Sequence, residues 1–225
     1  MGVCFIFAGM NCFFFPLFFL LAGPVAVCQS VDLSVDDHLE PEVSYITDMN
    51  HNNEYYPAVR ETLLSQVSDS PLARVVVLPT IAPEYAVSVE QNRKTKQCVM
   101  VWVVAKRSIL NDDTREDIPA TVTRVPIPIE LAQKLSALFR AGTAQVGYLK
   151  NKVWGTDGTT YHYSSFAVGD GIRAGYCWAP RSGSKMHGLV QIADLMLNVV
   201  KQNGSPVATQ TLATRADALL KRLKP

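Results

Sequence analysis

Asp157, His162 and Cys177 are the residues whose types could form a thiol nucleophile with its acid–base partners. An imidazole activates a thiol only when the two groups lie within hydrogen-bond reach. The sequence around them predicts a β-hairpin that pairs Tyr161 with Cys177 and His162 with Tyr176. Paired residues share a sheet face and alternate residues point to opposite faces. This register places Cys177 and His162 on opposite faces and argues against a thiol enzyme.

The sequence gives little support for acid–base catalysis by carboxylates. Asp157 and Asp170 are flanked by glycines, and turn preferences explain both carboxylates. No G-x-S-x-G motif is present. A hydrolase with an atypical site around His162, Asp157 and Arg181 stays open as an alternative. A cleft where His162 meets a carboxylate would favour it.

The histidines do not have the spacing of a metal site. The chain has four of them, and no pair shows the H-x₃-H or H-E-x-x-H pattern. His38 follows two aspartates in a segment without a clear period. We therefore expect no metal and no cofactor.

The best candidate for a ligand site is the segment Arg181, Ser182, Gly183, Ser184 and Lys185. It connects a predicted strand to a predicted helix, and free N–H groups at a helix N-terminus favour anions. Arg181 and Lys185 could add charge-assisted hydrogen bonds. The spacing differs from that of a Walker loop. An anion-binding module is therefore a second alternative, in competition with an ordinary helix cap at Ser184.

Aromatic residues are dense in the same region. The set consists of Trp154, Tyr161, Tyr163, Tyr176 and Trp178. Part of it must enter the core, but tyrosine and tryptophan are also common anchors of protein interfaces. These five residues are the candidates for a binding surface, and a role in the core alone is the alternative that burial preference favours.

The first 28 residues predict a secretory signal peptide. They carry no charged side chain, and an apolar block is followed by Gly23-Pro24 and small residues. Cleavage after Cys28 would give a chain beginning at Gln29. The apolar run is nearly long enough for an uncleaved membrane anchor, which is the alternative. Acylation of Cys28 is disfavoured because Val27 is not small.

Export would remove Cys4, Cys12 and Cys28 and leave Cys98 and Cys177. Disulfides persist in oxidising compartments, so the simplest expectation is a Cys98–Cys177 disulfide. Two separate buried thiols are the alternative.

Hydrophobic periodicity predicts one α+β domain over residues 54–225, after a flexible lead-in over residues 29–53. Four segments have the spacing of amphipathic helices: 54–69, 129–140, the segment after Ser184, and the segment after Pro206. Short alternating or apolar runs predict six or seven strands, mostly antiparallel, with helices packed on one face. Residues 98–105 are apolar on both faces and should lie centrally in the sheet.

Charge narrows the class of partner. All 41 Lys, Arg, Asp and Glu residues follow residue 28, and the net charge is +1. We therefore expect no nucleic-acid binding, and no stable membrane association after signal cleavage. Together these features favour a periplasmic or secreted, non-catalytic protein that binds a protein partner or another component of the cell envelope, as an immunity or inhibitor protein would.

Overall fold

The computed structural model describes residues 36–42, 54–149 and 157–224, which all belong to one compact unit spanning residues 32–225. The predicted signal segment and Trp154 lie outside the described residues. The elements are β1 (Glu40–Pro41), α1 (Tyr55–Leu63), η2 (Leu64–Gln66), β2 (Ala73–Pro79), β3 (Tyr85–Gln91), β4 (Cys98–Ala105), β5 (Ala120–Ile127), α2 (Ile129–Thr143), β6 (Thr159–Ala167), β7 (Gly171–Trp178), α3 (Lys185–Lys201) and α4 (Pro206–Leu223).

The strands form one antiparallel sheet of seven strands in the order β1-β7-β6-β2-β3-β4-β5. The predicted α+β class and the predicted sheet are confirmed. Strand β4 is interior, between β3 and β5, and apolar residues cover it on both faces. Two-sided burial explains why its sequence does not alternate.

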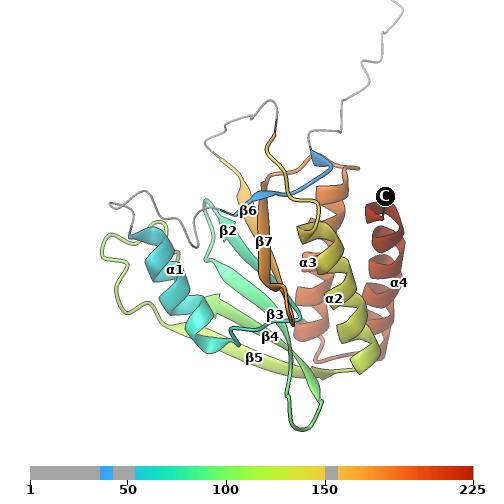
Figure 1. The fold of residues 1–225 in the computed structure, drawn as a ribbon. Helices are drawn as coiled ribbons and strands as arrows, with labels where there is room; N and C mark the ends of the chain where they lie inside the picture. The colour runs from blue at the N-terminus through green and yellow to red at the C-terminus, as the bar shows by residue number, and fades with distance from the viewer. Residues whose placement is uncertain (1–35, 43–53, 150–156, 225) are drawn as a thin grey trace, which may run out of the picture. The chain divides into compact units, whose positions relative to one another are not determined.

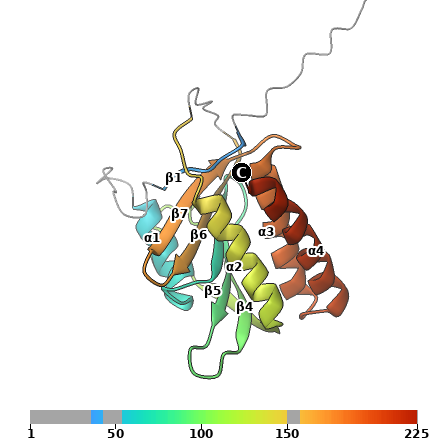
Figure 2. The same cartoon turned by 45° about the vertical axis from the view of Figure 1, so that its right-hand side comes forward.

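Helices α2 and α3 pack on one face of the sheet, and α4 packs against both of them on the outside (Figures 1 and 2). The large core lies in this layer, with Leu135, Ile192 and Met196 among its fully buried side chains. Glycine allows the helices to approach closely. A Cβ on Gly188 would lie 2.7 Å from Leu219 Cδ1 on α4. No helix among the described residues is long and apolar enough to cross a membrane.

Helix α1 adds a cover on the opposite face of the sheet, a position that the sequence did not predict (Figure 1). Its buried residues, including Val59 and Leu63, pack on β2, β3 and β4. Glu84 is fully buried and helps to hold α1 and the loop after β4 on this face. Its carboxylate accepts hydrogen bonds from the Tyr55 hydroxyl (3.1 Å) and the backbone N–H groups of Ile109 (2.7 Å) and Leu110 (2.8 Å).

Residues 36–42 differ from the flexible lead-in expected for them. Glu40 and Pro41 form β1 and pair with Tyr176 and Gly175 of β7. Leu39 is fully buried in the large core, and its carbonyl accepts a hydrogen bond from Gly147 N (2.9 Å). The described part of the lead-in is therefore part of the sheet and the core.

Candidate functional site

The β6–β7 hairpin has the register expected from the sequence. Tyr161 pairs with Cys177, and His162 pairs with Tyr176. Cys177 faces the large core under the helices, whereas His162 faces the side of α1. The two side chains therefore lie on opposite faces of the sheet, as predicted, and do not form a thiol–imidazole pair.

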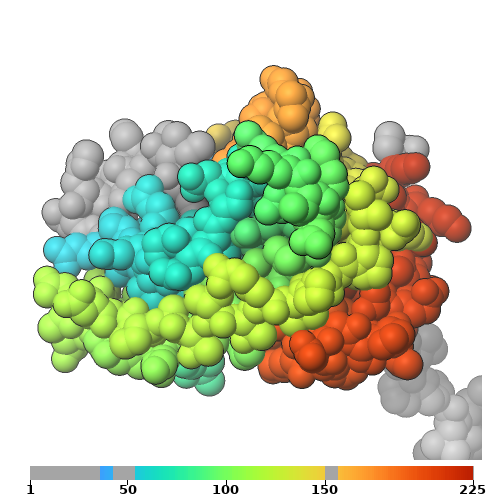
Figure 3. Space-filling model, turned by 90° about the horizontal axis from the view of Figure 1, so that it is seen from below, coloured from blue at the N-terminus to red at the C-terminus, as the bar shows by residue number. Residues whose placement is uncertain are grey.

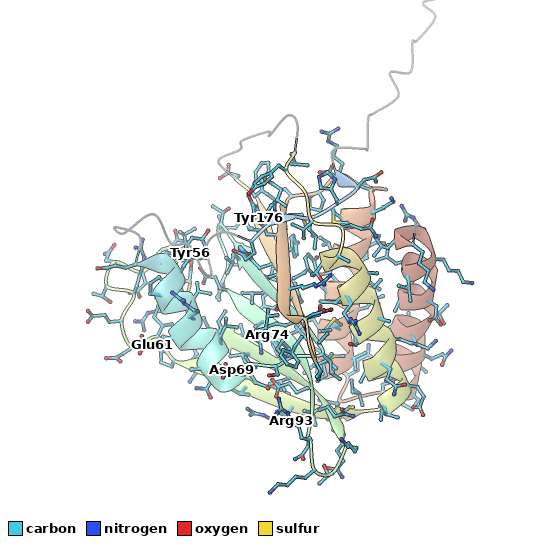
Figure 4. The ribbon with its side chains drawn as sticks, viewed as in Figure 1. Tyr56, Glu61, Asp69, Arg74, Arg93 and Tyr176 are labelled. Carbon is cyan, nitrogen blue, oxygen red and sulfur yellow. The ribbon has the colours of Figure 1, made fainter. Side chains whose placement is uncertain are left out.

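His162 instead belongs to a buried polar cluster on the α1 face. Its Nδ1 contacts a carboxylate oxygen of Glu42, and the two side chains are 4% and 2% exposed. The ring stacks on Tyr176, with 5.7 Å between centroids, and meets Tyr56 of α1 edge-on at 6.3 Å. The Tyr176 hydroxyl donates to Glu40 (3.1 Å). In Figure 4, Tyr56 and Tyr176 mark the helix and the strand that enclose this cluster.

The structure does not bring together the residues of the alternative hydrolase site. Asp157 precedes β6, which begins at Thr159, and an extended chain of five residues would separate the Cα atoms of Asp157 and His162 by up to about 16 Å. Arg181 lies beyond the end of β7, next to Asp36. The carboxylate that does reach His162 belongs to Glu42, from a segment whose sequence has no regular pattern. Its buried position is typical of a group that holds this segment on the sheet.

The basic loop that was the anion-site candidate already contacts carboxylates of this chain. The backbone N–H of Arg181 donates to Asp36 Oδ2 (3.1 Å), and its guanidinium lies 3.6 Å from the same oxygen. Lys185 Nζ lies 3.9 Å from Asp37. Ser184 caps α3 by accepting from His187 N at 3.0 Å, as expected. Ser182 and Gly183 are exposed in the turn between them. This arrangement fastens the lead-in to the start of α3.

The four aromatic candidates that the structure describes are buried or partly buried. Tyr163 is 1% exposed and packs edge-on against Phe139 of α2, with 5.6 Å between centroids. Tyr161 is partly buried on the same face, and Tyr176 and Trp178 are partly buried on the other. Their aromatic area therefore contributes to the packing of the fold, the role that burial preference favours for them.

The predicted Cys98–Cys177 disulfide does not fit the fold. Both cysteines are free and buried, on strands β4 and β7. Strands β6, β2 and β3 lie between them, so the two Cα atoms are at least about 19 Å apart at the normal strand spacing, far beyond the ~7 Å limit of a disulfide. Burial raises the pKa of both thiols above the ordinary value, and Asp36 and Glu40 raise that of Cys177 further.

These thiols should be inert in the folded protein. We expect iodoacetamide at neutral pH to label Cys98 and Cys177 at least tenfold more slowly than in guanidinium chloride, because burial restricts access and disfavours the thiolate. Peptide mapping by mass spectrometry, without reduction, measures each cysteine separately. A Cys98–Cys177 cross-linked peptide would contradict this fold.

The tip of the same hairpin presents an exposed surface that sequence reasoning missed. Val168 is 95% exposed and Ile172 is 53% exposed. The tip protrudes in orange at the top of Figure 3. We call Val168, Ile172 and the neighbouring edge of β7 the hairpin surface. A glycine-rich turn in a sequence predicts a hairpin but not whether its tip meets another part of the chain.

The backbone groups of β7 alternate between its two sides. Ala179 N donates to Thr159 O (3.0 Å), so alternation in an antiparallel ladder turns the N–H and C=O groups of Ile172 and Ala174 away from β6. Strand β1 covers β7 only at Gly175 and Tyr176. Among the described residues, no strand pairs with β7 between the hairpin turn and Gly175.

A cavity of about 220 Å³ lies beside this edge, between the end of α2 and the hairpin. Its lining residues include Arg140 of α2, Arg173 of β7 and the 2% exposed Ser165. The Ser165 hydroxyl lies 3.2 Å from that of Thr143. Asp170, 3.4 Å from Arg173, and small alanine and glycine residues complete the lining. In the described ranges, no group of three or more His, Cys, Asp or Glu side chains could hold a metal ion.

Comparison with known proteins does not assign the chain to a family. No protein-family model, curated protein or solved structure matches the chain. The surfaces of the chain itself are therefore the guide to its function.

Proposed function

We propose that the protein is an exported, non-catalytic protein of the periplasm or the outside of the cell, and that it binds a protein partner of the cell envelope through the hairpin surface. The observation that carries this proposal is the position of Val168 and Ile172. Two exposed apolar side chains lie beside the part of β7 that pairs with no strand among the described residues. Exposed apolar groups and unpaired strand edges are the features to which other chains add.

The arrangement of the polar groups supports a binding role. The His162–Glu42 pair is buried, and Glu84 is bonded to three donors of the chain. These groups hold α1, the loop after β4 and the lead-in in place. The uncharged, apolar segment over residues 1–28 supports export.

The proposal predicts site-specific cross-linking. A photo-reactive amino acid at position 168, in the natural host, should give a discrete cross-linked protein, whereas the same amino acid at exposed Lys94 should not. With the photo-reactive amino acid kept at position 168, the change Ile172→Asp should lower capture at least tenfold and leave the melting temperature within about 2 °C, because the Ile172 side chain is exposed. Equal capture from positions 168 and 94, or capture at position 168 that survives Ile172→Asp, would contradict the proposal.

A further inference from the structure

Residues 36–42, which we call the strap, carry four carboxylates, and each one meets a donor or a cation on the body of the domain. The pairs are Asp36 with Arg181, Asp37 with Lys185, Glu40 with Tyr176 and Glu42 with His162. We infer that the strap is sensitive to acid: it lies on the domain at neutral pH and separates from it when these carboxylates take up protons.

The pair of Glu42 and His162 links the strap to pH most directly. Their side chains are 2% and 4% exposed, and the Glu42 carboxylate contacts Nδ1 of the imidazole. A buried ion pair that loses one of its charges leaves the other without compensation, and this is strongly destabilising. When Glu42 takes up a proton, an imidazolium at His162 therefore needs water. Separation of the strap supplies that water.

Two further ion pairs act in the same direction at the start of the strap. The Arg181 guanidinium lies 3.6 Å from Asp36, whose carboxylate also accepts from the Arg181 backbone N–H. Lys185 lies 3.9 Å from Asp37. These pairs are partly exposed, so each stabilises the docked strap only weakly. A carboxylate that pairs with a cation in the folded state contributes stability above the pH at which it is protonated, and this contribution is lost in acid.

The groups that face the strap and its partner His162 determine the direction of the effect. Those that titrate or carry charge are Tyr56 of α1, His162 of β6, Tyr176 and Cys177 of β7, Arg181 and Lys185. Arginine and lysine stay charged in acid, and imidazoles, including that of His38 in the strap, gain charge. Protonation of the carboxylates therefore leaves positive charges without compensation on both sides. The Tyr176 hydroxyl can still donate to a protonated Glu40, so this pair is the least sensitive to acid.

The strap covers one of the two buried thiols. Extending the register of β1 and β7 by one residue places Leu39 opposite Cys177. Both side chains belong to the large core, and Leu39 is fully buried. Asp36 and Glu40 lie close enough to Cys177 to raise the pKa of its thiol. Separation of the strap should therefore expose Cys177.

Thiol accessibility in the full-length folded protein tests this inference. The reagent is 4,4′-dithiodipyridine, which reacts with thiols in acid as well as at neutral pH. Cys98 on β4 is the internal reference, because strands β6, β2 and β3 separate it from β7. Peptide mapping should show that the rate of Cys177 labelling, divided by that of Cys98, rises at least tenfold from pH 7 to about pH 4. Circular dichroism should retain the helix signal over this range.

Three variants test whether the strap carboxylates control this exposure. Glu42→Gln places a neutral side chain of the same size beside His162 at every pH, so the midpoint of the labelling change should move toward neutral pH by about one pH unit or more. Asp36→Asn removes a partly exposed charge next to Arg181, so this variant should fold and move the midpoint in the same direction. Asp69→Asn, at an exposed site after α1, should leave the midpoint unchanged.

Three results would overturn the inference. A labelling ratio that stays constant down to about pH 4 would show that acid does not separate the strap. Equal exposure of Cys98 and Cys177, with loss of the helix signal, would show general acid unfolding instead. The same midpoint in Glu42→Gln, Asp36→Asn and Asp69→Asn would show that the strap carboxylates do not control exposure. Cross-linking at position 168 tests the proposed function independently of all three results.

Discussion

Replacing Glu84 by alanine should lower the free energy of unfolding by about 3–5 kcal/mol, because three donors, two of them buried and one partly buried, lose their carboxylate acceptor. Those donors are the Tyr55 hydroxyl and the N–H groups of Ile109 and Leu110, which come from α1 and from the loop between β4 and β5. Without these hydrogen bonds, α1 and the loop between β4 and β5 should separate from the sheet. Burial and the Glu84 carboxylate raise the pKa of Tyr55, which keeps its hydroxyl protonated as a donor.

Denaturant unfolding followed by circular dichroism measures this effect. Glu84→Gln keeps the size of the side chain, but its NH₂ group faces a donor, so we expect a smaller loss of about 2–3 kcal/mol. Glu61→Gln, on the exposed side of α1, is the matched control and should stay within about 0.5 kcal/mol. If Glu84→Gln behaved like Glu61→Gln, the carboxylate would not stabilise this layer.

Replacing Gly175 by alanine should displace β1 from the sheet. A Cβ at this position would lie 2.7 Å from Val146 Cγ2, 2.9 Å from the Glu40 carbonyl oxygen and 2.9 Å from Leu39 Cβ. The carbonyl belongs to the backbone of β1 and cannot move without loss of its pairing with β7. We expect a loss of about 2–3 kcal/mol, the upper part of the range for overpacking.

Hydrogen exchange distinguishes this local effect from a general one. Protection of the Tyr176 amide, which faces β1, should fall at least tenfold, while the amide of Val87 in the middle of the sheet should change only with global stability. Ala174→Ser on the same strand is the control, and unchanged exchange at Tyr176 in Gly175→Ala would contradict the expected displacement.

The elements that could be predicted are those with a regular pattern in their own short stretch of sequence. The spacing of Leu189, Ile192 and Met196 predicted α3, and the turn glycines fixed the register that separates Cys177 from His162. Helix α2 ends at Thr143, three residues later than predicted, and the break at Gly142 is absent because this glycine packs against Leu189.

Long-range contacts explain what the sequence did not show. A two-residue strand such as β1 has no periodicity, and its partner lies far along the chain. Glu84 and Glu42 resemble surface residues because glutamate is rarely buried, and only the donors around them account for their burial. The cavity between Arg140 and Arg173 forms because α2 packs beside the hairpin. The sequence of neither segment predicts that packing.

The pairing of β1 with β7 also constrains the order of folding. Glu40 and Tyr176 are 136 residues apart, and β2 pairs with β6, which also follows it distantly in the chain. The middle of the sheet can therefore not close until β6 has been synthesised, and its β1 edge must wait for β7. Such non-local pairing slows folding because the entropy of a long loop is lost before the contacts form. A sheet that is completed only when β6 and β7 have been made suits a chain that must cross a membrane before it finishes folding, as the export proposed from residues 1–28 requires.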